Sequence, residues 1–94
     1  MDNIITTNEI IEQTIALRFF HAIEALKESK KTNLTRFCSD CNLSRIKYQV
    51  LKSSTTDHKK GRYVAIDGCA MVHLCKRYGV RPAWLLMGEG NMFK

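Results

Sequence analysis

The sequence lacks most of the features that mark membrane, secreted or enzymatic proteins. No run approaches the roughly 20 apolar residues that a membrane-spanning helix requires. The N-terminus, MDNIITTNE, begins with an acid and has no long apolar stretch, so we expect no signal peptide. There is no glycine-rich phosphate loop and no Ser, His and acid combination in a catalytic context. We therefore expect a cytoplasmic protein that is not an enzyme and has no cofactor.

The four cysteines are few and are not set in a small loop-rich scaffold, so we expect reduced thiols. Cys38 and Cys41 form a CxxC pattern, but no second closely spaced pair of the zinc-ribbon kind follows. The side chains that could complete a metal site are Cys69, His73, Cys75 and His58. We expect the CxxC cysteines to be buried as small hydrophobes, and a zinc-binding or redox module is the less favoured alternative.

Basic residues exceed acidic ones, and their excess is local. The 94 residues, 45% of them hydrophobic, suit one compact domain, with 15 Lys and Arg against 9 Asp and Glu and a net charge of +6. Residues 27–62 hold ten of these cations and three acids, whereas residues 1–26 are net negative. A polyanionic partner is therefore favoured, and it should meet the middle of the chain.

A long first helix is predicted by the capping-box pattern of Thr6 and Glu9, and it should run to about Ser29. It is either one long helix or a short arm hinged to a core helix. Its expected apolar stripe comprises Ile11, Ile15, Leu17, Phe19, Phe20, Ala22, Ile23 and Leu26.

Two short helices should follow. Asn33 or Thr32 can cap a helix over residues 34–41, and Asn42 suits a sharp left-handed turn. Ser44 should then cap a third helix that ends near residue 52. Its inward side chains should be Tyr48 and Leu51, with a polar, basic loop after it over residues 53–62.

The last third of the chain predicts two more helices and no strand. Asp67 is a good N-cap for a helix that Gly79 ends, and Pro82 suits the first turn of a short helix that Gly88 ends. The buried residues of the earlier of these helices should be Met71, Leu74, Cys75 and Tyr78. The apolar residues expected to close the core against the first helix, or alternatively to bind a partner, are Trp84, Leu85, Met92 and Phe93. The predicted fold class is all-α with five helices.

The third helix has an unfavourable charge pattern. Its first turn carries Arg45 and Lys47 with no acid, although a helix N-terminus has partial positive charge. Ile46, between them, should also face outward. Two short helices joined by a tight turn, the second with a basic outward face, are typical of a helix-turn-helix whose second helix enters the DNA major groove.

The segment FCSDCNLSRIKYQVLK resembles the lambda-repressor-like (XRE-type) helix-turn-helix domains, and YGVRPAWLLMGEGNMFK is similar to their closing segment. The resemblance, closest to the small stand-alone type of Bacteroidetes and phages, covers residues 14–94. It implies a five-helix DNA-binding domain there, with residues 1–13 as an N-terminal extension of the first helix. Asn42 replaces the family's usual turn glycine, Arg81 replaces its usual serine cap, and the loop after the third helix is longer than in its shortest members.

The resemblance also implies which residues face DNA. Ser44 matches the family's usual cap, and Arg45 to Lys47 match positions that reach base edges or phosphates. Gln49 and Val50 match the next turn, and Thr35 and Arg36 match phosphate contacts of the preceding helix. The full predicted set is Thr35, Arg36, Ser44, Arg45, Ile46, Lys47, Gln49, Val50, Lys52, Lys59 and Lys60.

Chemistry gives these residues different tasks. Arg45 suits a guanine, and Gln49 suits an adenine or a phosphate. Ile46 suits a thymine methyl group, or alternatively packs against Phe37. The residues expected at phosphates, with a solvated charge run as the alternative for the last three, are Lys47, Lys52, Lys59, Lys60 and Arg62.

These observations predict a sequence-specific double-stranded DNA-binding protein, a transcriptional regulator with repression as its expected output. A lone recognition helix buries little surface, so we expect a homodimer. Its predicted surface is the first helix, where Ile10, Ile11 and Ile15 are spare. The alternative from another class is a protein-interaction module with the same fold, such as an antitoxin.

Overall fold

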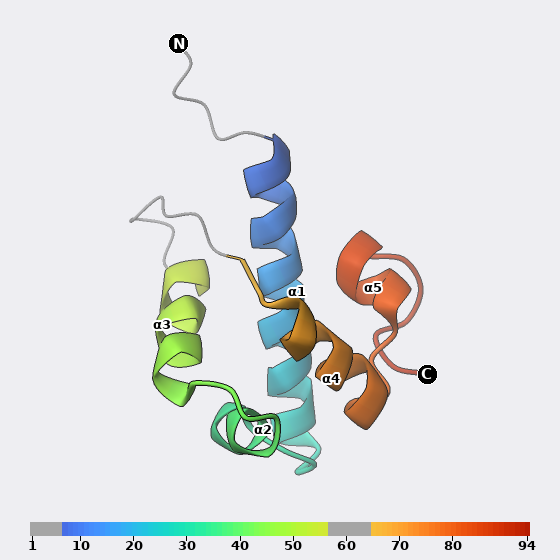
Figure 1. Cartoon of the computed structure of the whole chain (residues 1–94). Helices are drawn as coiled ribbons and strands as arrows, with labels where there is room; N and C mark the ends of the chain where they lie inside the picture. The colour runs from blue at the N-terminus through green and yellow to red at the C-terminus, as the bar shows by residue number, and fades with distance from the viewer. Residues whose placement is uncertain (1–6, 57–64) are drawn as a thin grey trace.

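The computed structural model describes residues 7–56 and 65–94 (Figure 1). The helices are α1 (Thr7–Glu28), α2 (Leu34–Asp40), α3 (Arg45–Thr56), α4 (Gly68–Tyr78) and α5 (Pro82–Met87). Across these two ranges the only β-type pairing is an isolated antiparallel bridge between Val80 and Phe93. The predicted all-α fold with five helices is therefore confirmed for the described part of the chain.

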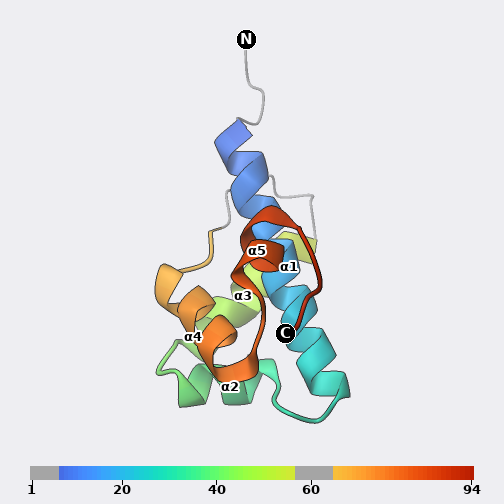
Figure 2. The ribbon, with the colours of Figure 1, turned by 90° about the vertical axis from the view of Figure 1, so that its right-hand side faces the viewer.

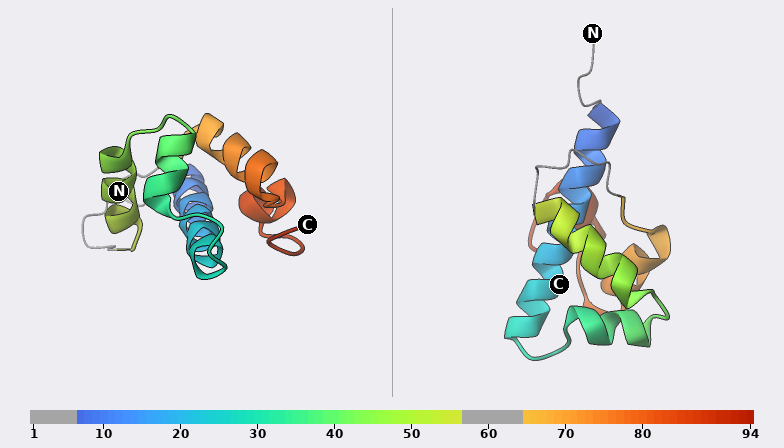
Figure 3. Two further views of the ribbon diagram at one scale, coloured as in Figure 1. Left: turned by 90° about the horizontal axis from the view of Figure 1, so that it is seen from below. Right: turned by 90° about the vertical axis from the view of Figure 1, so that its left-hand side faces the viewer.

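The central element is α1, and it is one continuous helix from Thr7 onward. Seen from below, α3 and the pair α4 and α5 lie on opposite sides of it, with α2 across its lower end (Figures 1 and 3). The first turns of α1 rise above the other helices (Figure 2). Thr6 lies outside the described residues, and so does the capping box that depends on it.

Most of the predicted apolar stripe of α1 is buried, but two of its members are not. Ile11 and Leu17 are exposed, which corrects the prediction. Ile11 lies in the first turns of α1, before its first buried residue, and Leu17 lies about 200° around the helix from the fully buried Phe19. Ile15, predicted as spare for a dimer contact, is buried in the core, so that assignment is wrong.

Aromatic rings join the first three helices. The ring centroid of Phe19 lies 5.1 Å from that of Phe20, 5.7 Å from that of Phe37 and 5.9 Å from that of Tyr48. Phe37 in turn lies 5.9 Å from Tyr78 of α4. Such pairs contribute about 0.5–1.5 kcal/mol each beyond the burial of their area. The cluster therefore fixes α2 and α3 against α1 through side chains that are widely separated in sequence.

The turn between α2 and α3 has the geometry that the sequence predicts. The Asn33 side chain caps α2 by accepting from the backbone N–H of Arg36 at 2.8 Å. Asn42 adopts the left-handed conformation with φ of 58°. The Ser44 hydroxyl oxygen accepts from the backbone N–H of Lys47 at 3.2 Å and so caps α3. Both short helices thus begin at the predicted side chains.

The helix α3 is longer than the sequence predicts. The helix continues to Thr56, so residues 53–56 are helical and do not belong to the predicted polar loop. Thr55 is buried, with 5% of its surface exposed, so the last turn of α3 packs against the rest of the fold although a Ser and Thr run has only modest helix propensity. Residues 57–62, the rest of that loop, lie outside the described residues.

The last two helices end as predicted, at Gly79 and Gly88, whose φ values are 73° and 72°. Within α4, Leu74 is fully buried, while Ala70 is an additional buried residue that the pattern did not indicate. The other predicted core residues of α4, which are only partly buried, are Met71, Cys75 and Tyr78.

The C-terminal segment closes the core against α1. Leu85 is buried, and the partly buried residues packed on the core there include Trp84, Met92 and Phe93. Arg18 of α1 donates from Nη1 to the backbone oxygens of Leu85 at 3.1 Å and Leu86 at 3.2 Å. These bonds satisfy carbonyls at the end of α5 that have no partner within the helix.

Candidate nucleic-acid interface

The outward face of α3 carries five of the residues predicted to contact DNA. Arg45, Lys47 and Gln49 are exposed, and Ile46 and Val50 leave 71% and 59% of their surfaces in solvent. Packing of Ile46 against Phe37, the alternative kept open from the sequence, is therefore wrong. Two branched apolar side chains one helical turn apart thus stand exposed beside hydrogen-bonding ones.

An open groove beside this face brings together three of the residues predicted to contact phosphates, Thr35, Arg36 and Lys52. It lies between the C-terminal half of α1, the start of α2 and the middle of α3, and encloses about 850 Å³. Its lining includes Thr35 and Arg36 of α2, and Gln49 and Lys52 of α3. Lys27 from the last turn of α1 also lines it. Sequence reasoning missed Lys27, although its place in the basic stretch was a signal.

One of the predicted phosphate ligands in this groove is paired with an acid. The ammonium of Lys52 lies 3.0 Å from the Glu24 carboxylate, and both side chains are partly exposed. The hydrogen bond from Lys52 holds the pKa of Glu24 below its ordinary value. An exposed ion pair of this kind contributes about 0–1 kcal/mol, so a phosphate can displace the carboxylate at little cost.

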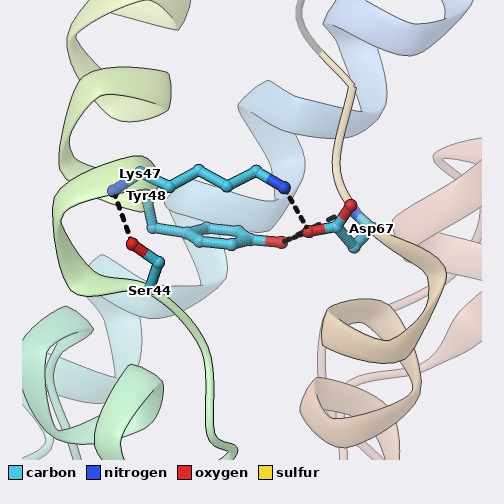
Figure 4. A network of polar contacts seen from close by, with 4 residues as sticks. All are labelled: Ser44, Lys47, Tyr48 and Asp67. Carbon is cyan, nitrogen blue, oxygen red and sulfur yellow. Dashed lines mark hydrogen bonds and ion pairs between the residues drawn. The ribbon is translucent and has the colours of Figure 1, made fainter.

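The N-terminal turn of α3 is tied to α4 by a polar network (Figure 4). Oδ2 of Asp67 accepts from the ammonium of Lys47 at 2.9 Å and from the hydroxyl of Tyr48 at 2.7 Å. The same hydroxyl oxygen accepts from the backbone N–H of Asp67 at 3.4 Å. The ammonium also lies 5.8 Å from the centroid of the Tyr48 ring. Successive residues of α3, one exposed and one buried, thus meet at a single carboxylate oxygen.

This network corrects the role predicted for Asp67. The residue stands at the N-cap position of α4, but its side chain makes no capping hydrogen bond. Hydrogen bonds from Lys47 and then Tyr48 hold the pKa of Asp67 below its ordinary value. Burial, followed by the hydrogen bond to Asp67, raises the pKa of Tyr48. The first turn of α3 contains no acid. Asp67, at the start of α4 and 20 residues after Lys47, therefore provides the negative charge beside that turn.

The cysteines divide into two kinds. Cys38 and Cys41 are buried, and burial raises the pKa of both thiols, as expected for small core hydrophobes. Cys69 is exposed and Cys75 is partly buried. In residues 7–56 and 65–94 no three His, Cys, Asp or Glu side chains gather as a metal site would require, and His58 falls outside those residues.

Three predicted cations, Lys59, Lys60 and Arg62, lie outside the described residues. No helix in the part of the chain that the structure describes is both long and apolar enough to cross a bilayer.

No protein-family model, curated protein or solved structure matches the chain. Any assignment of function therefore depends on the arrangement of the residues themselves.

Proposed function

We propose that the chain is a sequence-specific double-stranded DNA-binding protein that regulates transcription, with repression as its output. In this proposal α2 and α3 form a helix-turn-helix of the lambda-repressor-like kind, and α3 is the recognition helix that enters the major groove. The observation that carries the proposal is the outward face of α3. Ile46 and Val50 are largely exposed there beside Arg45 and Gln49, while Tyr48 is fully buried on the opposite side.

Such a face matches the chemistry of base edges. An Arg can pair with the N7 and O6 atoms of guanine, a Gln with the N6 and N7 atoms of adenine, and an exposed aliphatic side chain with a thymine methyl group. Exposed Ile and Val side chains gain nothing from water, whereas burial against thymine removes their surface from it. Residues that weaken α3 as an isolated helix are thus suited to a DNA surface.

Residues that line the groove beside α3 make the proposed contacts with the DNA backbone. Thr35 and Arg36 at the start of α2, with Lys27 and Lys52 on either side, offer a hydroxyl and three cations. Phosphate contacts fix the register of a helix in the groove, and the release of counterions makes the binding sensitive to salt. Ser44 takes part as the cap that sets the start of α3. Contacts from Lys59 and Lys60 stay a prediction.

A homodimer through α1 belongs to the same proposal, with Ile10 and Ile11 as its apolar contacts. Both are exposed, and both lie in the first turns of α1, before its first buried residue. We expect Ile11→Glu to shift the sedimentation coefficient from dimer to monomer and to weaken binding to a two-fold symmetric site. Leu17→Glu, also on α1, provides a control for the charge alone. Dimers that persist in Ile11→Glu would contradict this surface.

A protein-interaction module, such as an antitoxin with this fold, is the second candidate. It is favoured by an apolar groove of about 420 Å³ between α4 and α5, lined by residues that include Met71, Val72, Pro82 and Leu86. Val72 and Leu86 are exposed there, as is the neighbouring Met87. This face lies outside the surface proposed for DNA, so both activities are compatible with one chain.

Selection of bound sequences from a randomised duplex library, at two salt concentrations, tests the proposed function. A two-fold symmetric motif should be enriched, and the affinity should fall as salt rises. Lys76→Ala, which removes a cation from the α4 and α5 groove, should leave the motif unchanged. Sequence-blind binding or no binding would refute the proposal and favour the interaction module.

A further inference from the structure

Asp67 occupies a position that the proposed DNA contacts do not explain. It stands at the start of α4, outside the proposed reading face, yet its carboxylate contacts the first turn of α3. It is an acid set against a cation that is expected to meet phosphates. An acid there repels DNA, so a favourable effect on folding or binding has to explain its presence.

Asp67 makes two bonds to α3, and the two differ in their exposure to solvent. The bond from Tyr48 is partly buried and comes from a ring that is fully enclosed in the core. The bond from Lys47 is exposed, with about half of each side chain in solvent. The first bond resists competition from water and ions, whereas the second is open to any stronger anion that approaches α3.

We propose that Asp67 is a positioning residue for DNA binding, which fixes α3 through Tyr48 and holds Lys47 until a phosphate takes its place. This inference rests on the proposed function. In the free chain the Lys47 ammonium is kept over the Tyr48 ring and against the carboxylate. On DNA it exchanges Asp67 for a phosphate, while the Tyr48 hydroxyl stays bonded to Asp67 and keeps α3 in place.

The exchange has a consequence for affinity. Breaking the ion pair and leaving a carboxylate near DNA both oppose binding, so Asp67 lowers the affinity for every sequence. The bond to Tyr48 favours binding because it fixes the orientation of the α3 face that reads the bases. Replacement of Asp67 by Asn separates these two effects on affinity. An amide oxygen can still accept from the Tyr48 hydroxyl, but it does not hold an ammonium as a carboxylate does.

A double-mutant cycle on Asp67→Asn and Lys47→Met measures this exchange. Each variant is titrated with the enriched duplex and with a random duplex at several salt concentrations. We expect Asp67→Asn to tighten binding to both duplexes roughly three- to tenfold, and by less than about twofold when Lys47 is already Met. Lys47→Met should reduce the slope of log K against log salt by about one.

Two further variants separate positioning from simple stabilisation. Asp67→Glu, which restores the charge, should return the affinity toward that of the wild type. Tyr48→Phe, which keeps the ion pair, should lower the melting temperature and weaken binding without changing the salt slope. A purely structural role for Asp67 would change the melting temperature but not the coupling with Lys47.

Three outcomes would overturn the inference. An equal effect of Asp67→Asn with and without Lys47 would show that the two residues act independently. An unchanged salt slope in Lys47→Met would show that its ammonium does not pass to a phosphate. If the wild type enriched a motif but the variants gave either of these results, only this inference would fail. Absence of salt-dependent binding by the wild type would overturn the inference and refute the proposed function as well.

Discussion

Replacing Tyr48 by Phe removes one hydroxyl group from the junction of α3 and α4. In the wild type this hydroxyl donates to the Asp67 carboxylate at 2.7 Å and accepts from the Asp67 backbone N–H at 3.4 Å. The ring itself is fully buried, and Phe retains its contact with Phe19, whose centroid lies 5.9 Å away. The substitution therefore tests the hydroxyl and leaves the aromatic packing in place.

The size of the effect follows from the environment of the bond. A hydrogen bond to a charged group contributes about 1.5–3 kcal/mol to stability. The Asp67 side chain is 42% exposed and keeps Lys47 as a partner, so water compensates part of the loss. We expect the free energy of unfolding at pH 7 to fall by about 1–2 kcal/mol, which lowers the melting temperature of a domain of this size by about 4–8 °C for each kcal/mol.

The effect should depend on pH with a defined sign. The pKa of Asp67 is lowered in the folded chain, so its ionised form contributes stability above its ordinary value near 3.8. That contribution is lost as the pH falls through the lower folded pKa. Because the Tyr48 hydroxyl is one cause of the lowered pKa, the difference between wild type and Tyr48→Phe should narrow below pH 3.8 and be constant between pH 5 and pH 7.

Urea denaturation followed by far-UV circular dichroism, at pH 7 and near pH 2.5, measures both quantities. A Tyr48→Phe variant as stable as the wild type at pH 7 would show that the hydroxyl contributes nothing. An equal difference at both pH values would show that the Asp67 charge plays no part. Either result would refute the reasoning that ties α3 to α4 through this carboxylate.

Other substitutions separate base reading, phosphate contact and backbone geometry. Arg45→Ala should cost about 1–3 kcal/mol of binding free energy on the enriched site and relax its sequence preference. Lys52→Ala should weaken all sequences alike and flatten the salt dependence; identical behaviour of the two variants in fluorescence anisotropy titrations would contradict the placement of the recognition helix. Gly88→Ala should destabilise the fold by about 1–2 kcal/mol, because Gly88 has a left-handed backbone that disfavours a Cβ. The added Cβ would also lie 2.7 Å from Nη2 of Arg18 and would disturb the bonds from Arg18 to α5. Gly68→Ala is its control in thermal melts, since a Cβ there meets no atom within 4 Å, and an equal loss in both would refute the explanation.

Local signals in the sequence predicted the turn between α2 and α3 well. Asn33, Asn42 and Ser44 act through hydrogen bonds or dihedral angles within a few residues of themselves, so their roles can be predicted from spacing alone. The same holds for the glycines that end α4 and α5. Outward positions on α3 were also predictable, because burial of Tyr48 sets which side of a helix faces the core.

The errors concern interactions between distant segments. Asp67 has the pattern of a helix cap, but a tyrosine and a lysine from α3 compete for its carboxylate and hold it. Ile15 and Leu17 are both apolar, and only the packing of the other helices decides that the first is buried and the second exposed. The continuation of α3 to Thr56 likewise depends on a burial that a polar sequence does not reveal.

The attachment of α3 through its inner side has a consequence for how such a protein can change over generations. Tyr48 is its fully enclosed large side chain, and Leu51 packs partly against the core. The four outward positions at Arg45, Ile46, Gln49 and Val50 contribute little to that attachment. Substitutions there cost little folding stability, so under the proposed function the preferred DNA sequence can change while the scaffold stays the same.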